Sequence, residues 1–334
     1  MDLKTLCELN GASGDERAVR AAVLAAAKEA CGDVRIDRMG SVIACKKGRG
    51  GHRHILFSAH MDEVGFLILD ATEEGLLAFR PVGRVDPRAA VSKYVLVGEK
   101  KAPGVIGALA IHLQSAEDRR RVLGYDQLYI DIGAKSKDEA LSDCPPGSYA
   151  YFDAGYREFG DGCVVSKALD GRAGCWNLLR LLEGAYDADV TCAFVTQEQV
   201  GARGSMAAAF ASDADTAVIL NGVPAGDLGD VDKTRRVCEL GLGAAVSFMD
   251  PSAIGDPELY RELLSLGQRL SIPCQPARGV AGGGGAASFQ RTGPGKRVCV
   301  LSVPCRYTHG PSAVARLSDI DAQYRLARAF AEQA

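Results

Sequence analysis

The apolar run His54-Ile55-Leu56-Phe57-Ser58-Ala59 leads directly into the polar cluster His60-Met61-Asp62-Glu63. A short apolar run of this kind is typical of a buried central strand, and the polar cluster marks the carboxyl end of that strand. In open α/β sheets, ligands gather in the crevice beyond the carboxyl ends of the strands, because the loops converge there. The sequence therefore predicts an α/β sheet with His60 and Asp62 at its ligand-binding edge.

The rest of the chain predicts one α/β domain that is split by an insertion. Ser13 and Glu16 form the pattern of a capping box at the start of an early helix. Residues 66–165 show short alternating strands broken by turns, which is typical of a β-rich domain. Beyond them, helices are expected at about 175–185, at 257–270 and from Ser318, and strands at 190–195, 216–220 and 298–303. We therefore expect an α/β domain formed by residues 1–65 and 166–334, with an inserted β-rich domain at 66–165.

Polar residues also follow the other strands that the sequence predicts. These residues are Glu198, Gln199, Asn221, Arg306, Tyr307 and His309. Asp170 joins them from a position just before a helix that begins near Arg172. Imidazoles and carboxylates suit Zn, Co or Mn, and a bridging carboxylate can hold two such ions that together activate a water. A single histidine more often makes ordinary hydrogen bonds, so the hypothesis of a metal site depends on the joint placement of these residues.

Composition excludes several classes of function. A net charge of −3 and an aromatic share of 6% give no reason to expect a nucleic-acid or anionic-membrane partner. No apolar stretch is long enough to cross a bilayer and the first residues lack the features of a signal peptide, so we expect a cytoplasmic protein. The 11 cysteines include no Cys-x-x-Cys pair, which argues against a zinc knuckle or a disulfide framework. No Gly-x-Ser-x-Gly motif is present, so a serine hydrolase is disfavoured.

Several longer motifs, in order along nearly the whole chain, resemble the tetrahedral (TET) aminopeptidases. This family is number forty-two among the metallopeptidases and includes glutamyl and deblocking aminopeptidases. The motifs are Ser58-Ala59-His60-Met61-Asp62-Glu63-Val64-Gly65-Phe66, Pro81-Val82-Gly83 with Asp86-Pro87-Arg88, Ile130-Asp131-Ile132-Gly133-Ala134, Lys167-Ala168-Leu169-Asp170, Thr196-Gln197-Glu198 and Val303-Pro304-Cys305-Arg306-Tyr307-Thr308-His309.

The resemblance implies a three-layer α/β/α catalytic domain with an inserted PDZ-like domain that supports homo-oligomers, from dimers to tetrahedral dodecamers. It also implies an enzyme that removes N-terminal residues from short peptides with one or two divalent ions, Zn, Co or Mn. In this pattern His60 binds one metal, Asp170 bridges both and His309 binds the second. Asp62 fixes the ring of His60, and Glu198 is the general base.

Four features of the sequence depart from the family pattern. Gln199 stands where the family has a second, metal-binding glutamate, and Asn221 stands where it has a ligating aspartate. Gly171 replaces a second aspartate, and a Gly-Thr-Asp segment is replaced within the run Gly282 to Gly285. Three ligand carboxylates would leave about +1 on two dications, whereas Asp170 alone leaves about +3. The expected metal site is therefore weaker than that of the family.

Two hypotheses of function remain open from the sequence. The first is an active aminopeptidase with a weakened or single-metal site. The second is a catalytically inactive homologue that acts as a structural, regulatory or small-ligand-binding subunit. In the second case Gln199 and Asn221 are hydrogen-bonding replacements in a cleft without metal. Glu198 is then a solvated carboxylate or a partner of Arg172 or Arg203.

Overall fold

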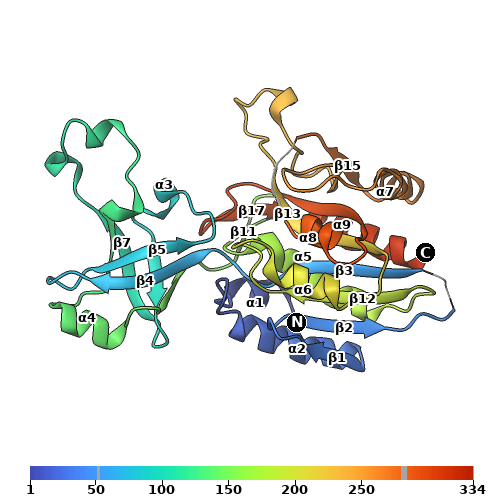
Figure 1. The fold of residues 1–334 in the computed structure, drawn as a ribbon. Helices are drawn as coiled ribbons and strands as arrows, with labels where there is room; N and C mark the ends of the chain where they lie inside the picture. Colours follow the sequence, from blue (N-terminus) through green and yellow to red (C-terminus); the bar gives the residue numbers. More distant parts are fainter. Residues whose placement is uncertain (51–52, 280–283, 334) are drawn as a thin grey trace.

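The computed structural model describes residues 1–50, 53–279 and 284–333 (Figure 1). Its largest sheet has eight strands in the order β1-β2-β12-β3-β13-β16-β14-β15. In that order they are Asp33–Ile36, Val42–Lys46, Asp189–Val195, His54–His60, Thr216–Pro224, Arg297–Cys305, Ala244–Ser247 and Cys274–Ala277. The four neighbours β12, β3, β13 and β16 run parallel, so their carboxyl ends lie side by side. The predicted central strand is confirmed, because β3 lies between two strands and is buried after its first residue.

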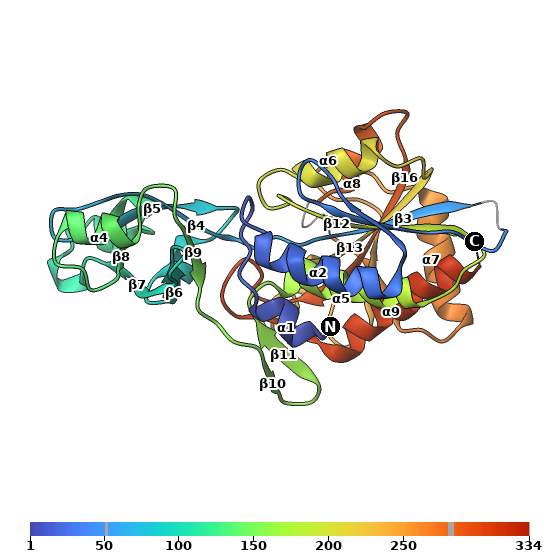
Figure 2. The ribbon, with the colours of Figure 1, turned by 90° about the horizontal axis from the view of Figure 1, so that it is seen from below.

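Helices cover both faces of this sheet (Figure 2). One face packs against α1 (Leu3–Glu8), α2 (Arg17–Ala30), α5 (Leu169–Glu183), α7 (Pro257–Arg269) and α9 (Leu317–Glu332). The other face packs against α6 (Arg203–Phe210) and α8 (Ala286–Arg291). The buried residues of α2 show the physical cause, since Val19, Val23 and Ala27 recur at helical spacing and form one apolar stripe. The architecture is therefore a mixed α/β fold with helices on both sides of the sheet.

The predicted capping box is wrong. Helix α2 begins at Arg17, and Glu16 occupies its N-cap position without a side-chain capping bond. The Ser13 hydroxyl instead donates to the carboxylate of Asp62. Both side chains bind partners far away along the chain, Asp62 for Ser13 and the Gln197 amide for Glu16. These contacts take the place of the local hydrogen bonds that define a capping box.

The β-rich segment forms a closed six-stranded barrel beside the α/β part of the molecule (Figure 1). Its strands, in barrel order, are β4 (Gly65–Ala71), β5 (Leu77–Val82), β8 (Leu128–Asp131), β7 (Ala102–Ala108), β6 (Tyr94–Val97) and β9 (Tyr149–Phe152). Two α-helices, α3 (Pro87–Ala90) and α4 (Lys137–Asp143), and three short 3-10 helices, η1 (Ile111–Leu113), η2 (Asp118–Arg120) and η3 (Tyr125–Gln127), connect these strands. The barrel has its own core, in which Phe66 packs edge-on against Phe79 and Phe152. Its likeness to a PDZ domain stays a prediction.

A small antiparallel sheet joins the segment after the barrel to the end of the chain. It contains β10 (Arg157–Phe159), β11 (Cys163–Ser166) and β17 (Ala313–Arg316). Because β11 leads into Asp170 and β17 follows His309, this sheet holds two predicted site residues near one another. The segment between β13 and β14 contains one further short 3-10 helix, η4 (Lys233–Arg235). All 11 cysteines are free thiols, and no helix among the described residues is both long and apolar enough to span a bilayer.

Candidate active site

The predicted site residues gather at the carboxyl ends of the four parallel strands. His60 is the last residue of β3, and Glu198 and Gln199 follow β12. His309 lies four residues beyond β16, which ends at Cys305. Asn221 lies within β13, because that strand continues to Pro224 instead of ending at Leu220 as the sequence suggested. The pairing of Ile219 with Ser58 places Asn221 level with His60 on the neighbouring strand.

A break at the start of α5 turns Asp170 into the same cleft. Asp170 and Gly171 have non-helical backbone angles, and φ of Gly171 is +86°. The Oδ1 atom of Asp170 lies 3.4 Å from Nε2 of His60, and its Oδ2 atom lies 3.6 Å from Nε2 of His309. The backbone amide of Gly222 also donates to Oδ1 at 2.8 Å. Burial alone would raise the pKa of Asp170, but the two imidazoles lower that pKa far below its usual range.

The ring of His60 is held from both of its nitrogens. Its Nδ1 atom lies 2.9 Å from the main-chain oxygen of Asp62 and 3.5 Å from the carboxylate of that residue. Its Nε2 atom faces Asp170. Burial would lower the pKa of His60, but the carboxylates of Asp170 and Asp62 outweigh burial and hold this pKa well above its usual range. A cation that bound at Nε2 would therefore compete with a proton.

The carboxylate of Asp62 connects His60 to the loop that carries Glu198 and Gln199. Its two oxygens accept the backbone amides of Glu198 and Gln199, each at 2.9 Å. The Oδ2 atom also accepts the hydroxyl of Ser13 at 2.5 Å. Burial favours the neutral acid, yet His60 and these donors keep the pKa of Asp62 below its usual value. Asp62 therefore lies where it orients the imidazole and fixes the loop after β12.

Glu198 has one paired and one unpaired carboxylate oxygen. Its Oε2 atom accepts the hydroxyl of Ser205 at 3.1 Å. Its Oε1 atom is buried and has no hydrogen-bond partner among the described residues. Burial raises the pKa of Glu198 to about 7. The suggested pairing with Arg172 or Arg203 is wrong, because these arginines donate instead to the main chain of Met61 and to the side chain of Gln197.

Glycines let the backbone approach this cleft closely. A Cβ atom on Gly284 would lie 2.7 Å from Nδ2 of Asn221 and 3.0 Å from Oε1 of Glu198. A Cβ atom on Gly171 would lie 2.5 Å from Cε1 of the His60 ring. The described end of the glycine run thus contacts the site, whereas Gly282 and Gly283 lie outside the described residues.

Three of the loops that form the cleft contain a non-glycine residue in the left-handed region. The values of φ are 57° at Ala168, 53° at Gln197 and 60° at His309. Each such residue costs on the order of 1–3 kcal/mol, and such residues cluster at functional sites. Their positions beside Asp170 and Glu198, and at His309 itself, support the assignment of this cleft as the functional site.

The cleft is a cavity of about 740 Å³ whose walls include side chains that the sequence did not single out. Arg84 follows β5 in the barrel, and Arg291 is the last residue of α8. The guanidinium of Arg291 donates to the main-chain oxygen of Ser252 at 3.1 Å. Within the part of the chain that the structure describes, neither arginine forms an ion pair with a carboxylate. Both cations are therefore available to an anionic ligand.

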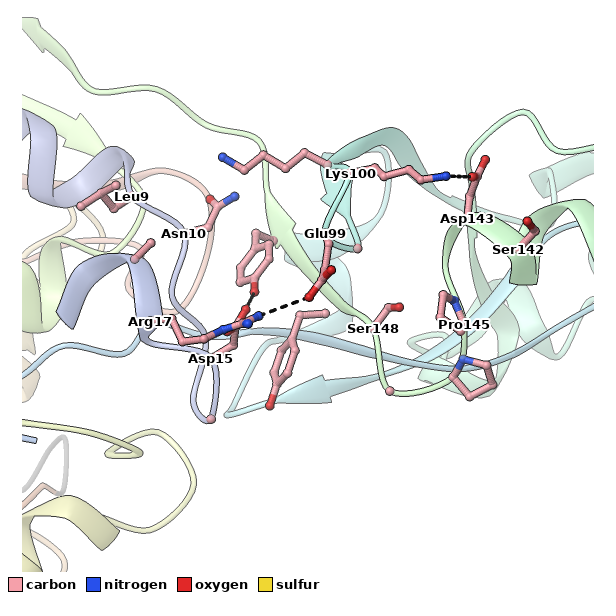
Figure 3. Close-up of a pocket in the computed structure, with 18 of the residues that line it drawn as sticks. Leu9, Asn10, Asp15, Arg17, Glu99, Lys100, Ser142, Asp143, Pro145 and Ser148 are labelled. Carbon is pink, nitrogen blue, oxygen red and sulfur yellow. Dashed lines mark hydrogen bonds and ion pairs between the residues drawn. The ribbon is translucent and has the colours of Figure 1, made fainter. Parts of the chain in front are cut away.

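A larger cavity of about 1040 Å³ lies between the first two helices and the barrel (Figure 3). Its charged side chains largely neutralise one another, as in the pairs of Arg17 with Asp15 at 2.6 Å and of Lys100 with Asp143 at 2.7 Å. None of the predicted site residues lines it. The predicted site residues therefore lie in the smaller cavity.

The donor set fits a divalent cation only in part. The two carboxylate oxygens of Asp170 face different histidines. One oxygen and the His60 ring would supply two donors at one metal position, and the other oxygen and the His309 ring would supply two donors at a second position. Among the described residues, no group of three or more His, Cys, Asp or Glu side chains is arranged to hold a metal ion. Any further donors would be the amide oxygens of Gln199 and Asn221, which line the same cavity and carry no charge. These residues fit a weakly held divalent ion better than two tightly held ones.

Comparison with known proteins gives consistent matches over nearly the whole chain. Residues 40–326 match the family model described as M42 glutamyl aminopeptidase. A putative aminopeptidase of Acetivibrio thermocellus is 34% identical over 328 residues, which cover 97% of this chain and 96% of the relative. An aminopeptidase from the archaeon Desulfurococcus kamchatkensis has a solved structure with a TM-score of 0.94 and 31% identity, covering 99% of this chain and 94% of that one. The TET1 peptidase of Pyrococcus horikoshii has a TM-score of 0.87 and 33% identity, covering 99% and 98%.

Proposed function

Because this chain belongs to the M42 glutamyl aminopeptidase family, we propose that it is a hydrolase that removes N-terminal residues from short peptides. One observation carries the proposal. The carboxylate of Asp170 lies between the imidazoles of His60 and His309, in the cavity that also contains Glu198. The aminopeptidase names of the relatives agree with this chemistry.

Asp170 with either His60 or His309, two side chains at each position, would hold a divalent ion, Zn, Co or Mn. Such an ion supplies Lewis-acid chemistry to amide hydrolysis. Asp62 orients the His60 ring through Nδ1, so that Nε2 points into the cavity. The protein thereby presents the nitrogen that faces Asp170 and keeps the other nitrogen occupied.

Glu198 is the general base of this proposal. A base works best when its pKa lies near the working pH, and burial raises the pKa of Glu198 to about 7. Its Oε1 atom lacks a partner among the described residues, so it is free to accept a proton from the attacking water. Ser205 holds the other oxygen and fixes the direction of the carboxylate.

Gln199 and Asn221 make the proposed metal site weaker than that of the family. An amide oxygen offers a dipole where a carboxylate offers a full charge, so each replacement reduces the attraction for a dication. We propose that the chain binds a single ion, or two ions only at high metal concentration. The absence of a three-residue metal-binding group among the described side chains supports this proposal. The same observation also favours the second candidate function, an inactive homologue that binds a small ligand or serves as a subunit.

We also propose that the chain forms a homo-oligomer. The Pyrococcus horikoshii relative is described as assembling into a tetrahedron or a large octahedral shell. In this chain, the segment between β7 and β8 of the barrel exposes apolar side chains, and exposed apolar patches often mark protein interfaces. These side chains are Leu109, Ile111, Leu113 and Val122, which are 54–70% exposed. Light scattering of the purified protein measures the assembly directly.

Metal analysis combined with a peptidase assay tests the proposed function. The purified protein is assayed on aminoacyl-anilides and short peptides, with Zn, Co or Mn added in turn and with a chelator as the control. We expect hydrolysis that depends on added metal and is lost in Glu198→Gln. An absence of hydrolysis with every metal and peptide would support the inactive homologue.

A further inference from the structure

Ser13 lies in the turn between α1 and α2, and its side chain contacts Asp62, the residue that orients the His60 ring. Its hydroxyl donates to Oδ2 of Asp62 at 2.5 Å. Both residues are buried, with exposed fractions of 5% for Ser13 and 0% for Asp62. A hydrogen bond to a buried carboxylate is stronger than a neutral one and leaves an unsatisfied charge when it is removed.

Glu16 contacts the same loop from the same turn. Its Oε1 atom accepts the backbone amides of Gly14 and Gln197, each at 3.0 Å. Since Asp62 accepts the amides of Glu198 and Gln199, three successive amides of the loop after β12 donate to buried carboxylates. Glu16 itself is 3% exposed. The loop that carries the proposed base is therefore held by the carboxylates of Glu16 and Asp62, neither of which is a proposed metal ligand.

The position of Gln197 shows why this loop needs support. Its φ of 53° places it in the left-handed region, which costs a residue with a side chain on the order of 1–3 kcal/mol. Glu16 accepts the amide of this same residue and so stabilises the unfavourable conformation. Without that acceptor, the amide of Gln197 would lose its partner, and the backbone before Glu198 and Gln199 would no longer be held in place.

We infer that Ser13 and Glu16 are positioning residues for the reaction. Together with Asp62 they fix where Glu198 and Gln199 point into the cavity. This inference rests on the proposed function for its kinetic consequence, but its structural consequence, an ordered loop at residues 197–199, does not depend on activity.

The barrel supports the same turn from the other side. The hydroxyl of Tyr149, in β9, donates to the main-chain oxygen of Ser13 at 3.2 Å. The hydroxyl of Tyr151 donates to the carboxylate of Asp15. Asp15 also pairs with Arg17, which reaches Glu99 of the barrel at 3.7 Å (Figure 3). The turn between α1 and α2 is thus held between the barrel and the loop that carries Glu198.

The test uses paired variants that remove or keep each hydrogen bond. Ser13→Ala removes the donor to Asp62, and Ser13→Thr keeps a hydroxyl. Glu16→Met removes the acceptor at similar length, and Glu16→Gln keeps an amide oxygen. Ser166→Ala is the matched control, because Ser166 is fully buried and its hydroxyl has no hydrogen-bond partner among the described residues.

Two measurements are made on each variant. Amide hydrogen exchange is followed at residues 197–199 and, for comparison, in β3 (His54–His60). The kcat and KM values are measured on the substrate that the natural protein hydrolyses best.

We expect Ser13→Ala and Glu16→Met to exchange about tenfold faster or more at residues 197–199, with β3 unchanged. In both variants kcat falls by about 10–100-fold, as is typical when a partner behind a catalytic group is removed, while KM stays within about twofold. Ser13→Thr and Glu16→Gln restore most of both values, and Ser166→Ala changes neither. If Ser13→Ala does not fold, the Glu16 pair gives the same comparison.

The outcomes distinguish this inference from the proposed function. Unchanged exchange at residues 197–199 in both Ser13→Ala and Glu16→Met would overturn the inference, whatever the activity. An equal loss of kcat in Ser166→Ala would also overturn it, because the effect would then be one of general stability. Faster exchange at this loop in a protein that hydrolyses no peptide with any metal would support the positioning role and reject the proposed function.

Discussion

The Nε2 atom of His60 lies 3.4 Å from Oδ1 of Asp170, so the buried imidazole and the carboxylate form an ion pair when the imidazole is protonated. The pKa of His60 is raised by this carboxylate and by Asp62, and a metal ion at Nε2 must displace a proton. In this chain Asp170 is the sole carboxylate among the five proposed ligand positions, since Gln199 and Asn221 are amides. The strength of metal binding is therefore the property that decides between an enzyme and an inactive homologue.

Replacement of the proposed base should separate activity from stability. Glu198→Gln removes a group that takes up a proton, so hydrolysis should fall by about 100-fold or more. Stability should not fall, because the native carboxylate has a buried oxygen without a partner among the described residues. An unfolded glutamate ionises near pH 4.3, whereas burial raises the folded-state pKa of Glu198 to about 7. Ionisation of Glu198 therefore destabilises the native state increasingly as the pH rises from about 4.3 to about 7, and the full cost remains at higher pH.

The Tm of natural protein and Glu198→Gln, measured in chelator at two pH values, checks this sign. At pH 8 the variant should melt at the same or a higher temperature than the natural protein, and at pH 4 this advantage should disappear. A variant that melts well below the natural protein at pH 8 would show that Glu198 stabilises the fold instead.

A side chain at position 171 should disturb the His60 ring. Gly171 has a φ of +86°, and a Cβ atom there would lie 2.5 Å from Cε1 of His60. Gly133→Ala is a matched control, because Gly133 has a φ of +78° and a Cβ atom on it would meet no described residue within 4 Å apart from its chain neighbours. Both variants carry the backbone cost of about 1–2 kcal/mol, and Gly171→Ala should lose a further 1–3 kcal/mol, roughly, from the contact. Urea unfolding measures the difference, and equal losses would mean that the contact is relieved at little cost.

The ion pair of Asp227 with Arg306 should stabilise the segment that leads to His309. Arg306 donates to the two carboxylate oxygens of Asp227 at 2.7 and 2.8 Å. Asp227→Asn should therefore lower the free energy of unfolding by about 1–3 kcal/mol at pH 7. Burial opposes ionisation of Asp227, but Arg306 and the Leu240 amide lower its pKa below the usual value.

The pH dependence of this pair has a definite sign. An unfolded aspartate ionises near pH 3.9, so the stabilisation should be complete above that pH and lost as the pH falls through the folded-state pKa. The difference between natural protein and Asp227→Asn, followed by chemical unfolding, should shrink toward acid. A difference that stays constant from pH 7 to pH 3 would contradict the role of the charged pair.

The two arginines of the cavity should bind the negative end of a short peptide. Arg84 and Arg291 line the cavity that contains Glu198, and we expect them to contact a substrate carboxylate. Arg84→Gln and Arg291→Gln should each raise KM by about tenfold for peptides with a free C-terminal carboxylate, and much less for the C-terminal amides. Arg88→Gln is the control, because Arg88 pairs with Asp86 and does not line this cavity. Equal effects on acid and amide peptides would rule out this contact.

The sequence predicted the main features of the sheet because they depend on local patterns. The apolar run before His60 forms the buried strand β3, and the strand that precedes Glu198 lies next to it. The end of β13 was misplaced, because Asn221 is polar but still belongs to the strand. A polar residue after an apolar run therefore does not by itself mark the end of a strand.

The supporting residues of the site could not be predicted from local patterns. Ser13 and Glu16 fit a capping box, yet their partners Asp62 and Gln197 lie 49 and 181 residues away along the chain. Arg84 and Arg291 reach the same cavity from the barrel and from α8. Only the tertiary structure brings such residues together, whereas the motifs of the family made Asp170 and His309 recognisable from the sequence.

Metal affinity tests the central claim most directly. The dissociation constants and stoichiometry for Zn, Co and Mn are measured by calorimetry for natural protein and for the double variant Gln199→Glu with Asn221→Asp. The matched control is Gln268→Glu with Gln333→Glu, which adds the same charge at exposed positions outside the cavity.

We predict that the repaired variant binds two ions and binds the first at least about tenfold more tightly than the natural protein, while the control matches the natural protein. Tight binding of two ions per chain by the natural protein, with an affinity equal to that of the repaired variant, would contradict the weakened metal site.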